Sequence, residues 1–187
     1  MRETFVEVGI IVKIVRSGDY DARLAIFTGK GLQWRTIKGV FRPKAKFAAS
    51  CGLFTVAEFT ISGQSVTGIN VLVAPYTLAK DIHRYYLACS FADALLRLDF
   101  VEQAPQALIN AVNAFTALGT TEQSCYPLFL DFYRNSLEIL GYQIDIEYDR
   151  ENLTHSQAKK LVLQMIEAYR QYVDYEIQFC EKLYLDV

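Results

Sequence analysis

The sequence has few of the residues that build metal centres. Its 187 residues include two histidines and four cysteines, and no two cysteines lie closer than 36 positions apart. Zinc sites usually place ligand pairs two to four residues apart, so we expect no metal and no cofactor. Scattered thiols in a chain without an export signal are typical of reduced core residues.

Motifs of the common enzymes and of membrane proteins are also missing. The chain has no GxSxG, P-loop or HExxH motif and no GxGxxG motif followed by a helix, and neither histidine lies in a catalytic motif. Its longest uncharged stretch, residues 59–79, is interrupted by Ser62-Gly63-Gln64-Ser65 and does not resemble a membrane span. Glu7 and Lys13 interrupt the N-terminal apolar run, unlike a signal peptide. The sequence therefore predicts a cytoplasmic protein that is not an enzyme and does not enter a membrane.

Charge is distributed unevenly along the chain. The formal net charge is -2, but residues 1–50 carry ten basic side chains and four acidic ones, whereas residues 51–187 carry nine basic and seventeen acidic ones. Such an asymmetry indicates a polyanion-binding head joined to an acidic body.

The first part of the chain has the pattern of β-strands. Strands are expected over residues 5–15, 24–28, 32–37, 54–61 and 66–73, separated by turns that contain glycine. Residues 42–50 contain helix-forming residues and predict a short helical link between the third and fourth strands. Three strands, a link and two more strands are the elements of a five-stranded barrel of the OB type.

After residue 76 the apolar residues recur with the period of a helix. Helices are expected over residues 77–98, 106–118 and 126–140, and a last helix opens at the capping-box pattern of Thr154 and Gln157 and continues to about Tyr184. The predicted fold class is therefore α+β, with an OB-fold barrel over residues 1–76 and an all-α helical domain over residues 77–187.

One segment points to a ligand. Residues 34–47 hold five cations and three aromatic residues without one acidic residue. Cations at this density follow a phosphate backbone, and aromatic faces stack on unpaired bases. The alternative is that the aromatic residues belong to the core and the cations to an ordinary solvated surface. We predict a nucleic-acid site made by Trp34, Arg35, Lys38, Arg42, Lys44 and Lys46.

Several motifs together resemble the bacterial recombination mediator family RecO. They are, in chain order, Gly18-Asp19-Tyr20-Asp21-Ala22-Arg23-Leu24, Ile26-Phe27-Thr28-Gly29-Lys30-Gly31, Lys38-Gly39-Val40-Phe41-Arg42-Pro43-Lys44, Gly52-Leu53-Phe54 and Leu137-Glu138-Ile139-Leu140-Gly141-Tyr142. The resemblance covers about residues 8–145 and rests on the order and spacing of the motifs. It implies a non-enzymatic protein that binds single- and double-stranded DNA, anneals complementary strands and helps to load recombinase onto single strands.

The resemblance also implies protein partners. These are the single-stranded DNA-binding protein, recognised through its acidic tail, and the partner mediator RecR. Arg134, among the apolar residues of its helix, is the candidate contact for the tail, and the alternative is a surface ion pair with Glu138. The chain departs from the family at residues 143–151, where no cysteine of a zinc module is present.

Two other functions remain open. The chain is acidic overall, which favours a protein-interaction adaptor that keeps the barrel but has no affinity for nucleic acid. An enzyme using the acidic run Asp145, Glu147, Asp149 and Glu151 is the third possibility, although a solvated loop explains this run without any ligand.

Overall fold

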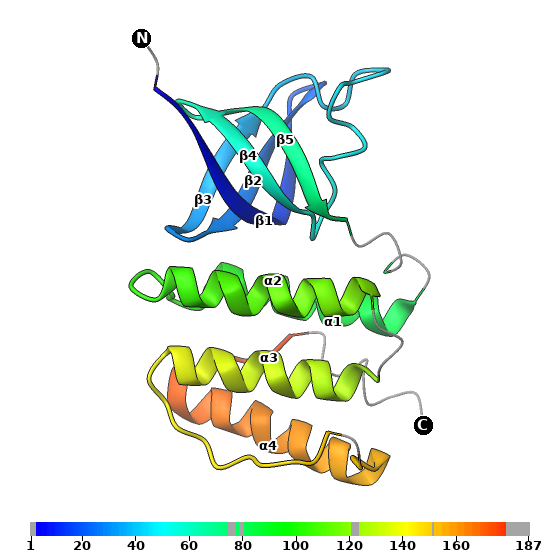
Figure 1. Cartoon of the computed structure of the whole chain (residues 1–187), viewed down its shortest axis with the longest axis vertical. Coiled ribbons are helices and arrows are strands. Elements are labelled where there is room, and N and C mark those ends of the chain that lie inside the picture. Colours follow the sequence, from blue (N-terminus) through cyan, green and yellow to red (C-terminus); the bar gives the residue numbers. More distant parts are fainter. Residues whose placement is uncertain (1–2, 75–77, 79–80, 121–123, 151, 179–187) are drawn as a thin grey trace.

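The computed structural model describes residues 3–74, 78, 81–120, 124–150 and 152–178. Figure 1 shows a β-barrel at one end of an elongated molecule and layers of helices beneath it. The elements are β1 (Thr4–Ser17), β2 (Asp21–Thr28), β3 (Gly31–Ile37), β4 (Val56–Ser62), β5 (Ser65–Val73), α1 (Ile82–Arg97), α2 (Ala104–Thr120), α3 (Cys125–Ile139) and α4 (His155–Val173). The predicted fold class, a five-stranded barrel followed by an all-α part, is confirmed.

The five strands close into a barrel in the order β1-β2-β3-β5-β4. All neighbours are antiparallel except β3 and β5, which are parallel and pair only at Thr36 and Ser65. β1 is long enough to pair with β4 through its first half and with β2 through its second half. Gly9 lies at this crossing, where an added Cβ would come 2.8 Å from the carbonyl oxygen of Phe27, so a side chain has no room there.

The middle of β1 and most of β2 are buried on both faces. Ile11 and Ile26 point into the barrel, where they join an apolar core with Phe59. Ile10 and Phe27 point outward and pack on the helices in a second, larger core. A strand covered on both faces loses the alternation of polar and apolar residues, which explains the continuous apolar runs in these strands.

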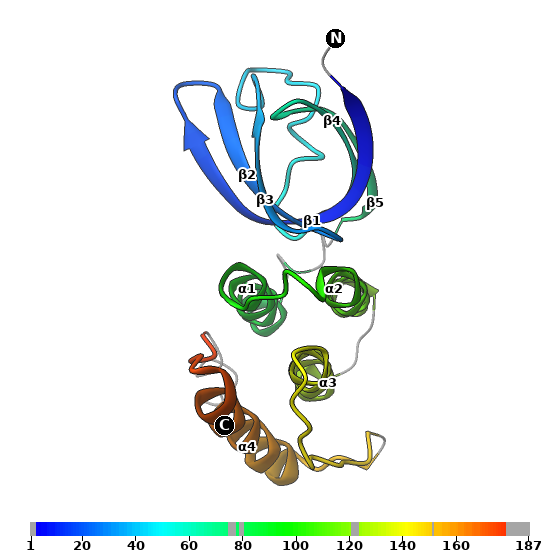
Figure 2. The ribbon, with the colours of Figure 1, turned by 90° about the vertical axis from the view of Figure 1, so that its left-hand side faces the viewer.

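The second core joins the barrel to the helices. Figure 2 shows α1 and α2 side by side beneath the barrel, with α3 and α4 farther away. The ring of Phe27 meets Phe100 at a centroid distance of 6.1 Å, and Phe54 stacks on Phe115 at 5.6 Å. The barrel floor and the first helical layer therefore share one apolar core.

The last helix begins at the expected cap but ends early, and α1 begins at Ile82, capped by Asp81, later than the expected residue 77. The side chains and main chain of Thr154 and Gln157 form the predicted capping box at the start of α4. The prediction of a helix continuing to about Tyr184 is wrong, because α4 ends at Val173. Asp174 adopts a left-handed conformation with φ 50°, and the chain turns so that Tyr175 and Ile177 enter the core. Ile177 continues the helical spacing of the apolar residues in α4, but it is buried as part of an irregular segment instead.

The link between β3 and β4 also differs from its prediction. Residues 41–50 form successive turns rather than a helix. The N–H groups of Ala45 and Ala48 donate to carbonyl oxygens three residues earlier, and Lys44 has a φ of 59°, which no helix contains. Pro43 and a left-handed Lys44 prevent the helical ladder from forming, even though the neighbouring residues favour helices.

The predicted domain boundary lies in residues 75–77, outside the described part of the chain. β5 ends before it at Val73 and α1 begins after it at Ile82. Among the described residues, no helix has the length and apolar character needed to cross a bilayer.

Candidate nucleic-acid interface

The segment between β3 and β4 holds its cations outward because its apolar residues are anchored inward. Val40 is buried, and Phe47 and Cys51 pack against the inner core of the barrel. Burial raises the pKa of the Cys51 thiol to about 11. The cations between these anchors are exposed, and two of them lie over aromatic rings, Arg42 over Tyr20 at 5.4 Å and Lys46 over Phe47 at 5.1 Å.

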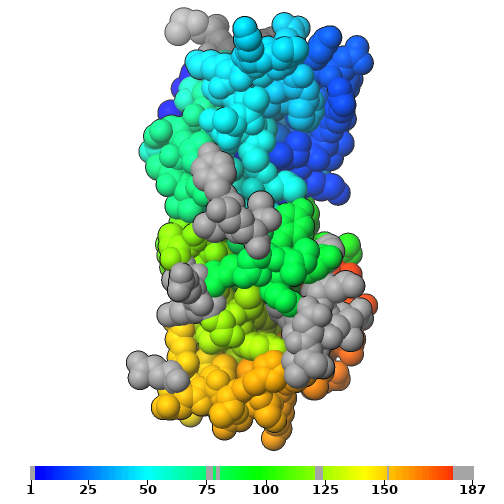
Figure 3. Space-filling model, turned by 90° about the vertical axis from the view of Figure 1, so that its right-hand side faces the viewer, coloured from blue at the N-terminus to red at the C-terminus, as the bar shows by residue number. Residues whose placement is uncertain are grey.

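This segment lies against the turn between β1 and β2. The N–H of Phe41 donates to the carbonyl oxygen of Tyr20 at 3.0 Å, and the N–H of Gly39 donates to the carboxylate of Asp21 at 2.7 Å. Gly39 has a φ of 66°, which lets the chain turn at this point. Figure 3 shows the segment (cyan) at the end of the barrel away from the helices, beside the β1–β2 turn (blue).

Three exposed aromatic rings in this region each carry an arginine. Arg16 lies over Phe41 at 5.3 Å, Arg42 over Tyr20 at 5.4 Å and Arg23 over Trp34 at 5.2 Å, each measured from Cζ to the ring centroid. The rings remain 37–48% exposed. An unpaired base can stack on such a ring. The phosphate of the same nucleotide can then pair with the neighbouring cation.

Four of the predicted contacts are exposed around these rings. They are Lys38, Arg42, Lys44 and Lys46. Among the described residues, none of the four forms an ion pair with a carboxylate. With Arg16, Tyr20, Arg23, Trp34 and Phe41 they form what we call the basic–aromatic surface.

Arg35 is placed differently from the other predicted contacts. Strand alternation turns it into the barrel, opposite Leu24, and its side chain is 13% exposed. The guanidinium donates to Oε1 of Gln64 at 3.0 Å and to the side-chain oxygen of Gln33, and it lies 3.9 Å from the carboxylate of Glu7. Because Arg35 is buried and compensated by a carboxylate, we leave it out of the proposed interface.

The sequence reasoning did not single out Arg16, Tyr20 and Arg23. They precede the acid-free run and stand beside Asp19 and Asp21, so their local charge is balanced. One available signal was strand pairing, because a hairpin across Gly29-Lys30-Gly31 brings Arg23 next to the strand that carries Trp34.

Arg134, the predicted partner contact, forms the alternative ion pair. Its Nε lies 3.0 Å from Oε1 of Glu138, one turn along α3. The apolar side chains expected beside it, including Leu130, Tyr133 and Leu137, are fully buried. The apolar groove that a docked tail would need is therefore not built from these residues.

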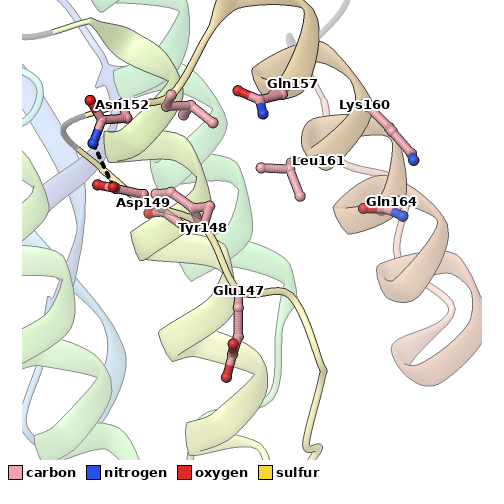
Figure 4. Close-up of a pocket in the computed structure, with 9 residues that line it drawn as sticks. Glu147, Tyr148, Asp149, Asn152, Gln157, Lys160, Leu161 and Gln164 are labelled. Carbon is pink, nitrogen blue, oxygen red and sulfur yellow. Dashed lines mark hydrogen bonds between the residues drawn. The ribbon is translucent and has the colours of Figure 1, made fainter.

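The acidic segment before α4 lines a polar pocket of about 410 Å³. Figure 4 shows Glu147 and Asp149 on one wall and Gln157, Lys160 and Gln164 of α4 on the other. Within the described ranges, no three histidine, cysteine or acidic side chains come together as metal ligands. This geometry gives no support to metal-assisted catalysis by the described acidic residues.

A search of protein-family models finds no match to this sequence, and a search of curated proteins finds none either. The function is therefore argued from the chemistry of the surface and from the motifs in the sequence.

Proposed function

We propose that this protein binds nucleic acid through the basic–aromatic surface and acts, without catalysis, as a mediator of recombinational DNA repair of the RecO type. The observation that carries the proposal is the set of three exposed arginine–aromatic pairs, surrounded by cations that form no ion pair with a carboxylate of the described residues. Phosphates pair with the cations while unpaired bases stack on the rings.

The position of this surface supports the same proposal. Its cation-bearing segment and the β1–β2 turn lie at the barrel end away from the acidic helical part, so a polyanion approaching there is attracted while the other end repels it. Barrels of the OB type bind oligonucleotides on the face of strands two and three and on neighbouring loops. Arg23 and Trp34 belong to these two strands, and Tyr20 belongs to the turn between strands one and two.

The mediator role rests on the motifs that resemble RecO. On that basis the proposed partners are single- and double-stranded DNA, the acidic tail of the single-stranded DNA-binding protein, and a RecR-type mediator. Strand annealing is the activity that a basic–aromatic surface alone would support, because it screens phosphate repulsion and leaves base edges free to pair.

The proposal is tested by replacing Lys38, Arg42 and Lys44 with alanine together. Loss of three phosphate contacts should lower the slope of log affinity against log salt for a single strand by about 2. Fluorescence anisotropy of a labelled oligonucleotide measures this slope, and annealing of complementary oligonucleotides should slow in parallel.

The matched control replaces Lys159, Lys160 and Arg170 of α4 with alanine. It removes the same charge from the helical part and should leave both measurements unchanged. If wild-type protein binds no oligonucleotide at low salt, the adaptor function replaces the proposal. Equal salt slopes for the two triple variants would show that binding occurs elsewhere.

A further inference from the structure

β3 has a free main-chain edge. It pairs with β2 from Gly31 to Ile37, but on its other side it pairs with β5 only at Thr36. The N–H of Thr36 donates to the carbonyl oxygen of Gln64 at 2.9 Å, so the main-chain groups of Thr36 point away from β2. Main-chain groups alternate along a strand, so those of Leu32 and Trp34 point to the same free side.

Within the described part of the chain, the edge at Leu32 and Trp34 has no main-chain hydrogen bonds. Among the described residues, no donor or acceptor meets the main-chain groups of Leu32 and Trp34 on that side. Their side chains are also open to solvent, at 36% and 37% exposure. Residues 31–35 contain no proline, no lysine and no bulge, which blunt many strand edges, and the one inward-pointing charge, Arg35, is compensated by the carboxylate of Glu7.

We propose that the free edge of β3 pairs, antiparallel, with the same edge of a second copy of this chain. A two-fold axis at Gln33 sets Leu32 opposite Trp34 of the other copy and Trp34 opposite its Leu32. Both residues point their main-chain groups outward, so this register forms hydrogen-bonded pairs, and it leaves the bond of Thr36 to Gln64 intact.

The side chains in this register are self-complementary. On the exposed face each leucine lies beside the other copy's tryptophan, an aliphatic–aromatic cross-strand pair that stabilises a sheet. Arg35 stands opposite Gly31, which has no side chain, and the pairing ends there because Ser65 of the same chain already lies opposite Thr36. No two like charges oppose each other, which favours a second copy over an unrelated strand as the occupant.

The edge is short, so the dimer should be weak. Two main-chain residues per copy bury far less surface than a standard stable interface. The inference uses the main chain of β3 and does not depend on the proposed function. The joined sheet would carry two Arg23–Trp34 pairs on one face.

Sedimentation equilibrium of the full chain across the micromolar to millimolar range tests this pairing. We expect a reversible dimer at the high end and its loss in Leu32→Pro, which removes an N–H from the free edge but none from the ladder with β2. Gln33→Pro, in contrast, breaks that ladder and should unfold the barrel. A monomer at every concentration would overturn the proposal, as would a dimer that Leu32→Pro leaves unchanged.

Amide hydrogen exchange of the wild-type protein gives a second test that needs no variant. The amides of Gln33 and Arg35 should be protected at all concentrations, because β2 binds them. The amides of Leu32 and Trp34 should exchange quickly in dilute solution and become protected as the dimer forms. Fast exchange of both amides in a sample that has dimerised would place the interface elsewhere.

Discussion

The guanidinium of Arg23 lies over the indole ring of Trp34, with Cζ 5.2 Å from the ring centroid. The register of β2 and β3 sets Arg23 opposite Thr36 and Trp34 opposite Ala25, so the two side chains are diagonal neighbours on the outer face of the barrel. The indole has one face beside a cation and remains 37% exposed. A base can stack there while its phosphate meets Arg23.

Replacing Trp34 with leucine should therefore weaken binding of a single strand by roughly tenfold, since one stacked base contributes about 1–3 kcal/mol. Trp34→Phe keeps an aromatic face and should retain most of the affinity. Anisotropy titrations with a labelled oligonucleotide compare the three proteins. Identical affinities for the leucine and phenylalanine variants would mean that no base stacks on this ring.

Arg134 offers a test of the proposed contact with an acidic tail. The apolar neighbours of Arg134 are buried, so a labelled tail peptide of the single-stranded DNA-binding protein could meet this helix only through the charge of Arg134; we expect micromolar binding that Arg134→Ala abolishes. Breaking the ion pair with Glu138 should itself cost only about 0.2–0.5 kcal/mol, so loss of binding would not reflect unfolding.

Glu138→Ala is the matched control for this titration. It breaks the same ion pair but leaves Arg134 available, so the tail should bind at least as well as to wild type. Equal binding by wild type and Arg134→Ala would remove Arg134 from the contact. If neither protein binds, the helical part has a different partner.

The protein should fold without metal. The described residues hold no cluster of metal ligands, so a chelator such as EDTA should leave the melting temperature of freshly purified protein unaltered. Elemental analysis of the same sample provides the control. Zinc at one equivalent per chain would contradict both this expectation and the departure from the RecO family at residues 143–151.

Cys51 reports on how firmly the cation-bearing segment is anchored. Burial raises its pKa to about 11 from an ordinary 9.0, so the folded chain holds the proton more tightly than the unfolded chain. This stabilisation is present below pH 9 and is lost as the pH rises through 11. Near pH 8 the folded thiol should be alkylated about a hundredfold more slowly than in urea, because thiolate is the reactive form.

Peptide mapping by mass spectrometry after iodoacetamide treatment reads Cys51 separately from the other cysteines. Cys125, whose pKa burial also raises to about 11, should be similarly slow and serves as an internal comparison. Alkylation of folded Cys51 at the urea rate would mean that the segment opens readily and does not hold its cations in place.

The sequence predicted the strands well because their apolar residues and turns are local signals. Glycine at the turn after β2 and the serine–glycine pair after β4 mark two hairpins, and both form. The parallel contact between β3 and β5 depends on residues 29 positions apart, and no local pattern predicts it. The end of α4 was missed for a related reason, since Tyr175 is drawn into the core by Tyr169 and by Asp93, 82 residues earlier.

The candidate surface was predicted only in part. Charge density singles out Lys38, Arg42, Lys44 and Lys46, which are exposed in the structure, because a run without acidic residues can be read directly from the sequence. It also grouped Arg35 with them, but strand alternation turns that side chain into the barrel, which a count of charges does not register. Arg16 and Arg23 join this surface because the β1–β2 turn and the pairing of β2 with β3 bring them beside Phe41 and Trp34. These contacts exist only in the folded barrel, so the local sequence does not reveal them.

The core shared by the barrel and the first helical layer connects the two parts of the molecule rigidly. Phe27 and Phe54 from the barrel contact Phe100 and Phe115 from the helical part, so the two parts cannot swing on a hinge without exposing these rings. When the barrel moves, the helices therefore move with it as one rigid body. If the barrel binds nucleic acid as proposed, a partner on the helices would be held at a constant distance and angle from it.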